Sequence, residues 1–462
     1  MTIWIPELDR SKPLYLAIAD SIGLAVASGT LSKGQRLPPQ RDLAWKLGVT
    51  LGTVTRAYKQ AELRGLLSGE VGRGSFVRTD ADRVVAPLAQ RSEEIADLSQ
   101  ALPPPVVGMA EFDAALHHVM HDPNRLALLD YAAPEGQPAH RAMMVRWLAL
   151  SGIEIQEKDV FVTAGAHSAL VTTLAALREP HDKILAEEIN YAHLKHLFRK
   201  SDMEAIGLAM DDNGLLPDAL DGAAAKTGAR LLYLVPSLQN PTTHTMSRQR
   251  RDDIVAVARK HDLTIIEDDI FRLLDERVQP PTFYSLAPER SYHISSLSKT
   301  LAPGLRMGVI AVPQGQDRLM RNHVRSMPPR ISSLNGEVAR YWIEGALAGT
   351  ILGRARSELA KRRQAFLDVF RDCSFSCSQA APYAWLQVPE PWSGARFAAA
   401  ALALNIKISP GSIFELSAQG KARNHVRICF GGPSSFGQCL QAFQSLRQLL
   451  GEAPEDDFNP VA

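Results

Sequence analysis

The sequence has few cysteines and no long apolar run, which argues against a zinc-binding, a secreted or a membrane-spanning protein. The cysteines, at positions 373, 377, 429 and 439, match no common zinc-binding spacing, so we expect reduced thiols and no metal site. No apolar run approaches the roughly 20 residues that span a bilayer, and the N-terminus lacks the basic and apolar parts of a secretory signal. The sequence therefore predicts a cytoplasmic protein with no membrane partner.

The net charge is also small, at +1 over 462 residues, so the chain as a whole lacks the basic character typical of nucleic-acid-binding proteins. The charge is uneven, because residues 1–80 contain 11 Lys and Arg residues but 7 Asp and Glu residues. This excess of positive charge would indicate DNA binding only if the same residues contained a DNA-binding motif. The length predicts about three domains.

Three short helices are predicted in the first 66 residues. Apolar periodicity, with prolines and glycines at the boundaries, places them within residues 13–29, 38–48 and 50–65. Two short helices joined by a glycine-containing turn are typical of a helix-turn-helix. Thr53 and Arg56 lie away from the apolar face of the third helix, where they can enter a major groove.

Residues 66–77 contain two β-type runs around Gly72-Arg73-Gly74, which predicts a hairpin with a basic tip. The helices and the hairpin together indicate a winged helix-turn-helix. An amphipathic three-helix surface bundle is the alternative, but it gives no reason for a basic hairpin at this position.

Over residues 11–78 the strings L-x-x-G-x-R-L-P-x-x-R-D-L-A, T-V-x-R-A-Y and G-x-G-x-F-V resemble the GntR-type winged helix. The resemblance implies that double-stranded DNA is a partner, contacted by Arg41, Thr53, Arg56, Arg73 and Gly74. The family's recognition helix usually begins Ser-Arg-x-Thr, whereas this one begins Thr-Leu-Gly-Thr. Leu51 therefore replaces a basic contact, which predicts altered operator affinity or base preference.

Beyond residue 100, short aliphatic runs alternate with helical patterns. The runs are VFVTAG, KILAEE, ARLLYLVPS, LTIIEDD, SYHISSLSK and GVIAVP. This alternation predicts an α/β fold with a mostly parallel sheet covered by helices. Ligands bind such sheets at the carboxyl ends of the strands, which is where the polar clusters of this sequence stand.

The clearest of these clusters is SSLSKTLAPGLRMG at residues 295–308. Lys299 follows a strand, with Ser296 and Ser298 before it and Arg306 after it. This set suits an aldehyde cofactor that carries a phosphate, because the amine can form a Schiff base while hydroxyls and a guanidinium hold the phosphate. A surface lysine is the alternative for this cluster alone.

A second cluster, IIEDDIF, ends another strand and places Asp268 where a carboxylate can pair with a pyridinium nitrogen. The alternative is a magnesium site built from Glu267, Asp268 and Asp269. Successive strand residues point to opposite faces of a sheet, so three in a row cannot converge on one ion.

Three weaker clusters stand in the same region. TAGAHSAL is a glycine turn into a helix whose first amides can receive phosphate, and PSLQNPTT contains a rigid Asn240-Pro241 turn. HVRICF contains Arg427, which suits bidentate capture of a carboxylate. Each cluster alone has a structural explanation, but all five in this order favour a cofactor site.

The ordered set, over about residues 97–450, resembles fold-type I aminotransferases. The resemblance implies pyridoxal 5'-phosphate as cofactor, a large domain with the mostly parallel sheet, and a smaller α+β C-terminal domain. It also implies that Lys299 carries the cofactor, that Asp268 pairs with its ring nitrogen and that Asn240 bonds its ring oxygen.

The same resemblance implies roles for the remaining site residues. Phosphate would be held by Ser296, Ser298, Arg306 and the amides of Ala166 and His167. Tyr191 would stack on the ring, and Arg427 would take an effector's α-carboxylate. Tyr131 would reach the neighbouring subunit's phosphate.

Some positions depart from the family pattern. Ile270 and Phe271 stand where a tyrosine usually bonds the ring oxygen, Ala166 replaces the usual serine of the phosphate turn, and Ile189 replaces a proline. We expect cofactor binding to survive, with weak transamination at best. His193 and His196 could form a metal pair, but the sequence favours a solvated surface for both.

A winged helix joined to an aminotransferase-like body resembles the MocR subfamily of GntR-type regulators. The resemblance implies a homodimer that senses the cofactor, or its adduct with an amine or amino acid effector. The predicted parts are residues 1–78 for DNA binding, 79–110 as linker, and 111–325 and 326–462 as large and small domains. The alternative is an aminotransferase with a vestigial DNA-binding domain, but an enzyme would not need the intact DNA-binding motifs.

Overall fold

The computed structural model describes residues 4–6, 8, 12–27, 30–32, 34–63, 66–70, 74–77, 95–179, 182–326, 331–417 and 420–452. The chain forms two compact units, one up to residue 90 and one that begins at residue 91. They are called the N-terminal unit and the body.

The described part of the N-terminal unit contains helices followed by an antiparallel hairpin: α1 (Leu14–Ala27), α2 (Gln40–Leu47), α3 (Leu51–Leu63), β1 (Leu67–Glu70) and β2 (Gly74–Val77). Helix α2 ends at Gly48, whose left-handed backbone (φ 64°) suits glycine. The Thr50 hydroxyl accepts a bond of 3.2 Å from the Thr53 amide at the start of α3.

Apolar side chains from all three helices form the core of this unit. Ile18 and Ile22 of α1 and Val54 of α3 are buried together, and buried Tyr58 donates to the Pro38 carbonyl at 2.7 Å. The predicted helix-turn-helix and hairpin are therefore confirmed.

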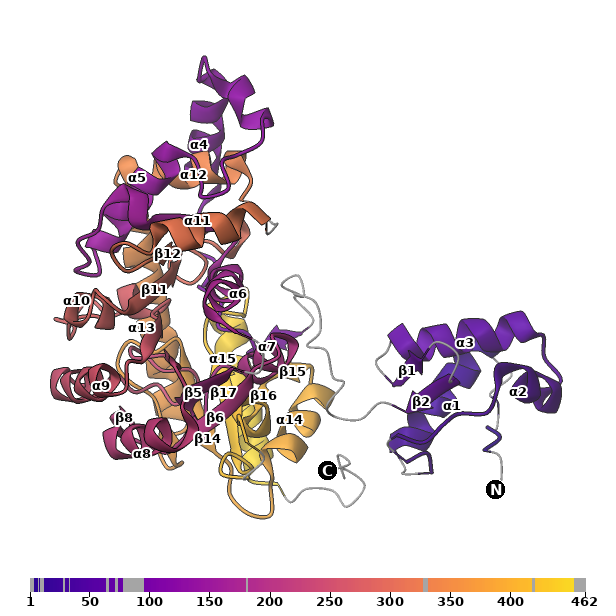
Figure 1. The fold of residues 1–462 in the computed structure, drawn as a ribbon. Coiled ribbons are helices and arrows are strands. Elements are labelled where there is room, and N and C mark those ends of the chain that lie inside the picture. Colours follow the sequence, from indigo (N-terminus) through magenta and orange to yellow (C-terminus); the bar gives the residue numbers. More distant parts are fainter. Residues whose placement is uncertain are drawn as a thin grey trace. The chain divides into compact units, whose positions relative to one another are not determined.

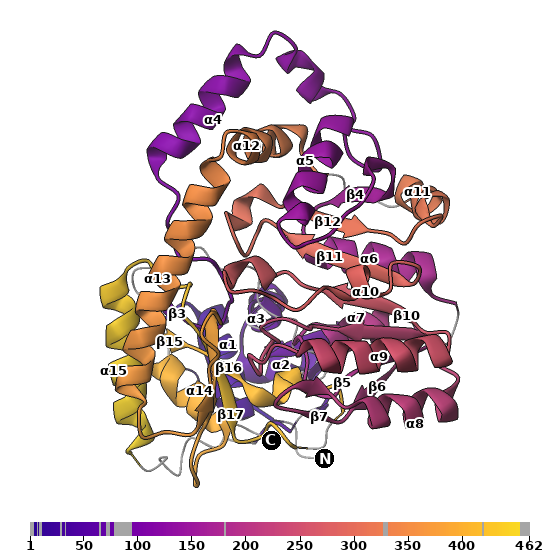
Figure 2. The ribbon, with the colours of Figure 1, turned by 90° about the vertical axis from the view of Figure 1, so that its left-hand side faces the viewer.

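The body is built on a seven-stranded sheet in the order β4-β12-β11-β10-β9-β5-β6 (Figures 1 and 2). The strands are β4 (Val160–Thr163), β5 (Lys183–Glu187), β6 (Glu204–Leu208), β9 (Leu231–Leu234), β10 (Thr264–Asp268), β11 (Ser291–Ser296) and β12 (Gly308–Ala311). Strand β12 runs antiparallel to both neighbours, and the other pairs are parallel. The mostly parallel sheet is thus confirmed.

Helices cover both faces of this sheet, and alternate strand residues enter separate cores. Ile184 and Ile266 pack under α6 (Ala166–Leu177), α7 (Leu194–Lys200) and α11 (Asp317–Ser326). Leu185 and Ile265 pack under α8 (Pro217–Thr227), α9 (Arg248–Lys260) and α10 (Phe283–Leu286). Between β6 and α8 lies a short hairpin of β7 (Met210–Asp211) and β8 (Gly214–Leu215).

The C-terminal part carries a four-stranded antiparallel sheet: β13 (Phe375–Ser376), β14 (Tyr383–Gln387), β17 (His425–Cys429) and β16 (Ser409–Pro410). Its helices are α13 (Leu347–Val369), α14 (Gly394–Ala403) and α15 (Phe436–Leu450). Strand β3 (Ala96–Asp97), at the start of the body, pairs in parallel with β15 (Ile406–Lys407). The smaller α+β C-terminal part expected from the family resemblance is therefore present, and the segment that follows β3 lies beside it.

Helix α4 (Met109–His121) contacts α12 (Ser333–Glu344), and α5 (Pro138–Ala149) packs on α12 and on β4 (Figure 2). Helix α4 and the turn after it expose several apolar side chains: Met109, Phe112, Met120, Leu126 and Leu129. In the part of the chain that the structure describes, no helix is long and apolar enough to cross a membrane.

Candidate functional site

The predicted cofactor residues follow the carboxyl ends of the central strands. Asp268 ends β10, Lys299 follows β11, Asn240 follows β9, Tyr191 follows β5 and Ala166 follows β4. These strands point the same way, so the five residues meet at one edge of the sheet. The C-terminal part contributes Arg427, from β17.

The Lys299 ammonium lies inside this edge and donates to the Ala101 carbonyl at 2.8 Å. Burial lowers the pKa of Lys299 to about 8, and the nearby Arg427 guanidinium acts in the same direction. A larger share of this amine is unprotonated near neutral pH than for an exposed lysine. It therefore suits attack on an aldehyde.

The Asp268 carboxylate is buried, and burial raises its pKa to about 6 although the Tyr233 hydroxyl donates to its Oδ2 at 2.8 Å. Its other oxygen, Oδ1, is buried and has no hydrogen-bond partner among the described residues. Buried polar atoms are normally paired, so this acceptor fits a donor such as a protonated ring nitrogen.

The neighbouring carboxylates face the other side of the sheet, as alternation requires. Glu267 and Asp269 lie with His293 in one buried group whose candidate ligand atoms are within 4.8 Å of one another. Glu267 accepts from the His293 Nδ1 at 2.9 Å and lies 3.7 Å from the Arg251 guanidinium. The Arg272 guanidinium lies 3.5 Å from Asp269, so each of the two carboxylates has an arginine beside it.

The start of α6 follows a glycine turn that lies against Arg306. Gly165 has φ 96°, and the Arg306 Nη2 donates to the Ala164 carbonyl at 3.1 Å. A Cβ atom on Gly308 would lie 2.5 Å from the carbonyl carbon of Gly165, so β12 can approach the turn only as glycine. The amides of Ala166 and His167, at the N-terminus of α6, and the guanidinium therefore lie at one place, as a phosphate needs.

The two serines of this edge differ. The Ser296 hydroxyl donates to the Met307 carbonyl at 3.0 Å and accepts from the Ser298 amide at 3.1 Å. The Ser298 hydroxyl is buried and has no partner among the described residues. Ser298 is thus available to an anion, whereas Ser296 also stabilises the loop, which the sequence did not predict.

Arg427 fixes the orientation of the Asn240 amide. Its Nη1 donates to the Asn240 Oδ1 at 2.6 Å and its Nη2 to the Ser99 carbonyl at 2.5 Å. The Asn240 Oδ1 is therefore committed, and its Nδ2 is left to donate elsewhere, as a cofactor's ring oxygen requires. The Arg427 guanidinium lies 4.7 Å from the centre of the Phe414 ring and is buried, which suits capture of a carboxylate.

Tyr191 lies among aromatic rings at this edge. Its ring centre is 5.0 Å from that of His193 and 6.5 Å from that of His167, and burial raises the pKa of Tyr191 to about 12. Burial also lowers the pKa of both histidines. His193, the residue before α7, is half-buried beside Tyr191, so the expected solvated surface holds only in part for it, whereas His196 is exposed.

Some predicted positions lie apart from this cluster. Tyr131 is 98% exposed and does not reach the cluster within its own chain. Phe271 is buried against Tyr383, whose hydroxyl donates to the Leu238 carbonyl at 2.5 Å. The sequence missed Tyr233 and the Ser99 carbonyl. Tyr233 lies within an apolar strand and did not stand out as polar. The Ser99 contact uses the backbone carbonyl, which every residue has, so the residue type could not indicate it.

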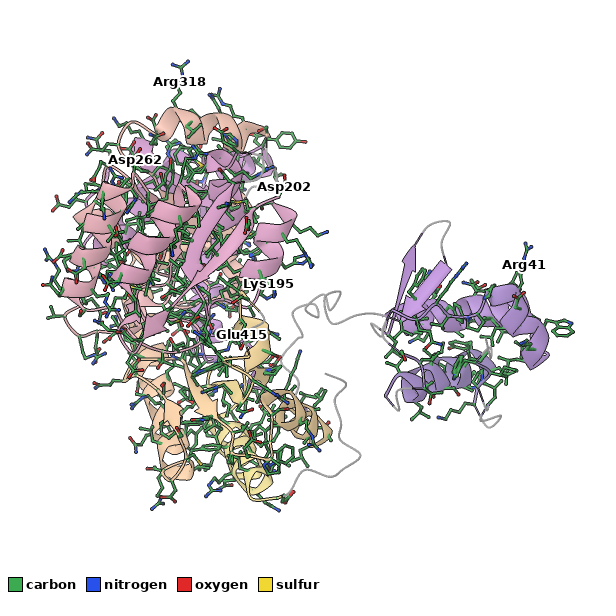
Figure 3. The ribbon with its side chains drawn as sticks, turned by 60° about the horizontal axis from the view of Figure 1, so that its bottom comes forward. Arg41, Lys195, Asp202, Asp262, Arg318 and Glu415 are labelled. Carbon is green, nitrogen blue, oxygen red and sulfur yellow. The ribbon has the colours of Figure 1, made fainter. Side chains whose placement is uncertain are left out.

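The predicted DNA-contacting residues lie on α2, α3 and β2. Arg41 is exposed on α2 and points outward (Figure 3). Thr53 is half-buried, with its hydroxyl 2.9 Å from that of Thr50. Arg56 is exposed, but its guanidinium lies 4.4 Å from the centre of the Tyr15 ring, a contact the sequence did not predict. Gly74 begins β2, and Arg73 lies outside the described residues.

Known proteins resemble both units. Residues 95–439 match the family described as Aminotransferase class I and II, and residues 14–77 match Bacterial regulatory proteins, gntR family. YdeF, an uncharacterized HTH-type transcriptional regulator of Bacillus subtilis, is 27% identical over 97% of this chain and 97% of its own. PdxR, the HTH-type pyridoxine biosynthesis transcriptional regulator of Corynebacterium glutamicum, is 27% identical over 74% of this chain and 75% of its own.

Among solved structures, an archaeal alanine:glyoxylate aminotransferase has a TM-score of 0.72 and 21% identity, covering 77% of this chain and 91% of its own. A Thermus thermophilus α-aminoadipate aminotransferase, LysN, has a TM-score of 0.70 and 22% identity, covering 78% and 92%. At this identity the likeness shows the fold. The chain belongs to the aminotransferase class I and II family, and its GntR-type domain gives it the composition of MocR-type regulators.

Proposed function

We propose that this protein is a transcription regulator that binds DNA through its N-terminal unit and pyridoxal 5'-phosphate through its body. The observation that carries the proposal is the pairing, in one chain, of a GntR-type domain with the half-buried Lys299 and with the Asp268 Oδ1, which has no partner among the described residues. When bound, the cofactor would supply an electrophilic carbon to an amine or amino acid effector.

Each residue of the edge then has a role toward the cofactor or the effector. Lys299 holds the cofactor, Asp268 keeps its ring nitrogen protonated, and the Nδ2 of Asn240 bonds its ring oxygen. Arg306, Ser298 and the first amides of α6 hold the phosphate. Arg427 takes the effector's carboxylate, because it is a buried cation already fixed by Asn240 and Ser99.

We propose a homodimer as the working form. The apolar side chains exposed on α4 and on the turn after it are the kind of surface that a partner covers. Tyr131 directly follows this surface and would enter the partner's phosphate site.

An aminotransferase is the second candidate, favoured by the completeness of the lysine, aspartate and arginine set. Phe271 argues against efficient turnover, because it cannot donate to the ring oxygen. The name of YdeF, which matches this chain over 97% of its length, supports the regulator, and so does the name of PdxR, which matches 74% of the chain.

The proposal is tested by binding of the full chain to the DNA upstream of its own gene, with and without pyridoxal 5'-phosphate and candidate amines. We expect a protected site whose affinity depends on these ligands. The Lys299→Ala variant should bind DNA without that dependence. Absence of binding to any duplex at low salt would leave the aminotransferase as the function.

A further inference from the structure

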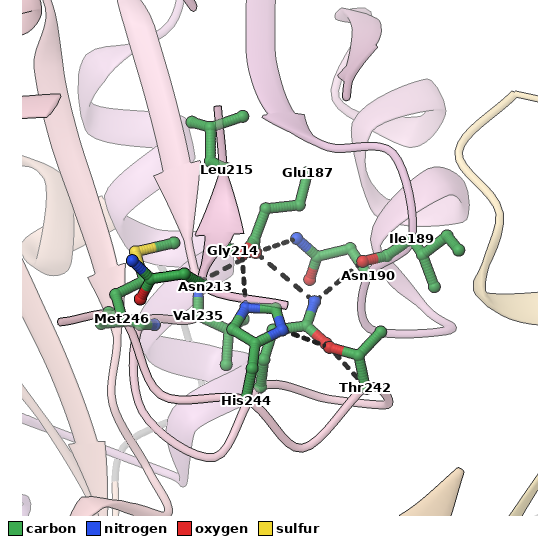
Figure 4. A network of polar contacts seen from close by, with 12 residues as sticks. Glu187, Ile189, Asn190, Asn213, Gly214, Leu215, Val235, Thr242, His244 and Met246 are labelled. Atoms are coloured by element: carbon green, nitrogen blue, oxygen red, sulfur yellow. Dashed lines mark hydrogen bonds and ion pairs between the residues drawn. The ribbon is translucent and has the colours of Figure 1, made fainter. Parts of the chain in front are cut away.

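A closed ring of side-chain contacts joins Glu187, at the end of β5, to the loop after β9, which also carries Asn240 (Figure 4). Gln239 donates from Nε2 to the Ile189 carbonyl at 2.8 Å and lies 3.5 Å from the Glu187 Oε2. The Thr242 hydroxyl lies 2.7 Å from the Gln239 Oε1 and 2.6 Å from the His244 Nδ1. The His244 Nε2 lies 3.6 Å from the Glu187 Oε1, which closes the ring.

The position of each proton in this ring follows from its neighbours. A carbonyl accepts only, so the bond to Ile189 fixes which end of the Gln239 amide is Nε2 and which is Oε1. The Oε1 also only accepts, so the Thr242 hydroxyl donates to it. That hydroxyl therefore accepts from the His244 Nδ1, which must carry a proton.

The other ring nitrogen of His244 then faces a carboxylate. Its Nε2 and the Glu187 Oε1 are buried, and neither has a hydrogen-bond partner among the described residues. The side chains are only 6% and 0% exposed, and 3.6 Å leaves no room for an intervening water. If no proton lay between them, two lone pairs would face each other away from solvent, at a cost that buried groups do not normally bear.

The surroundings place this proton on the histidine. The Glu187 Oε2 accepts from the Asn190 Nδ2 at 3.0 Å and from the Val235 amide at 3.3 Å, and such bonds favour the ionised carboxylate. Among the described residues, Asp211 of β7 also interacts with the His244 ring, and it pairs with Arg250 of α9. The Arg250 bond, and to a smaller extent the charge of His244, lower the pKa of Asp211.

The ring adds side-chain contacts to a loop that contains strained backbone. Leu238 (φ 50°) and Thr243 (φ 69°) have left-handed backbones, which cost non-glycine residues energy. Glu187 also holds Asn190, whose Oδ1 accepts from the Tyr191 amide at 2.7 Å. The same network therefore supports the elements that carry Asn240 and Tyr191.

We propose that His244 is a positioning residue, protonated on both ring nitrogens at neutral pH, which fixes the Asn240 loop against Glu187. The role rests on the proposed function, since it acts through the bond of Asn240 to the cofactor. The position of Asn240 is especially important in this chain, because Phe271 stands where a tyrosine would otherwise donate to the ring oxygen.

The protonation is tested by neutron diffraction of the deuterated full chain at pH 7. We expect deuterium on both ring nitrogens of His244. In Glu187→Gln the new amide can donate to Nε2, so His244 should carry one deuterium and the loop should keep its shape. A single deuterium on wild-type His244 would overturn the assigned protonation.

The positioning role is tested by the affinity and the absorbance spectrum of bound pyridoxal 5'-phosphate. His244→Phe should raise the Kd about tenfold, or about 1.4 kcal/mol, and shift the pH midpoint of the cofactor's spectrum, which a general loss of stability would not do. His261→Asn, which removes a histidine paired with Asp221, is the matched control and should change neither. An unchanged midpoint in His244→Phe would overturn the role, whereas failure of the wild type to bind cofactor would overturn the proposed function and leave the neutron result standing.

Discussion

Asp268 should make the cofactor-free protein less stable as pH rises, and replacing it with asparagine should remove this effect. The pKa of the carboxyl is about 6 in the folded chain and 3.8 ordinarily, mainly because burial penalises its charge. The folded state therefore binds this proton more tightly than the unfolded state. The group's contribution to stability is largest below the unfolded pKa and falls as pH rises through the folded one.

The difference of about two pKa units corresponds to about 3 kcal/mol, because one unit is about 1.4 kcal/mol. About 2 kcal/mol of this lies between about pH 4.5 and 7.5. A protonated ring nitrogen bonded to the free Oδ1 would lower the folded pKa, so cofactor binding should cancel most of the loss.

The assay is urea unfolding of the cofactor-free full chain, followed by tryptophan fluorescence across this pH range. The free energy of unfolding of wild type relative to Asp268→Asn should fall by about 2 kcal/mol from the acid to the neutral end. Comparing slopes removes any constant cost of the buried amide. Parallel pH profiles for the two proteins would refute the assigned environment of Asp268.

Four further predictions concern the cofactor and the DNA. Lys299→Ala should lose the cofactor adduct that borohydride traps in the wild type, and peptide mapping that places the adduct on another lysine would contradict the assignment. Gly308→Ala should weaken cofactor binding at least about tenfold, about 1.4 kcal/mol, because the new Cβ meets the Gly165–Ala166 peptide; Gly304→Ala, which meets nothing within 4 Å, is the control and should bind normally. Arg56→Gln should cost roughly 1–3 kcal/mol in DNA binding and change base preference, whereas Arg41→Gln should weaken binding to all duplexes alike and lower the salt slope by about one; equal losses on all sequences for Arg56→Gln would remove it from base reading. Transamination of common amino acids should stay far below the median enzyme turnover of about 10 s⁻¹, and a rate near that value would favour the enzyme.

The sequence predicted the fold because its patterns are local. Prolines and glycines bound α2, Thr50 begins α3, and alternating aliphatic residues form strands with two covered faces. Alternation also separated Asp268 from Glu267 and Asp269 correctly.

Contacts between distant segments could not be predicted in this way. The Ser99 carbonyl reaches Arg427 because β3 pairs with β15, a pairing of two residues on each side with no periodic signal. His193 is half-buried because it lies beside Tyr191 in the loop after β5. His244 meets Glu187 because the loop after β9 packs against the end of β5, where Gln239 donates to Ile189. Helical spacing alone assigned His193 to the surface.

If the cofactor site is coupled to DNA within one chain, the two kinds of binding must be linked thermodynamically. Binding energies are reciprocal, so the factor by which pyridoxal 5'-phosphate with an effector amine changes DNA affinity must equal the factor by which DNA changes their affinity. We predict matching factors of about 5 to 150 in the two titrations of the full chain. Equal cofactor and effector affinities with and without the bound upstream DNA would contradict the account, because the two units would then act independently.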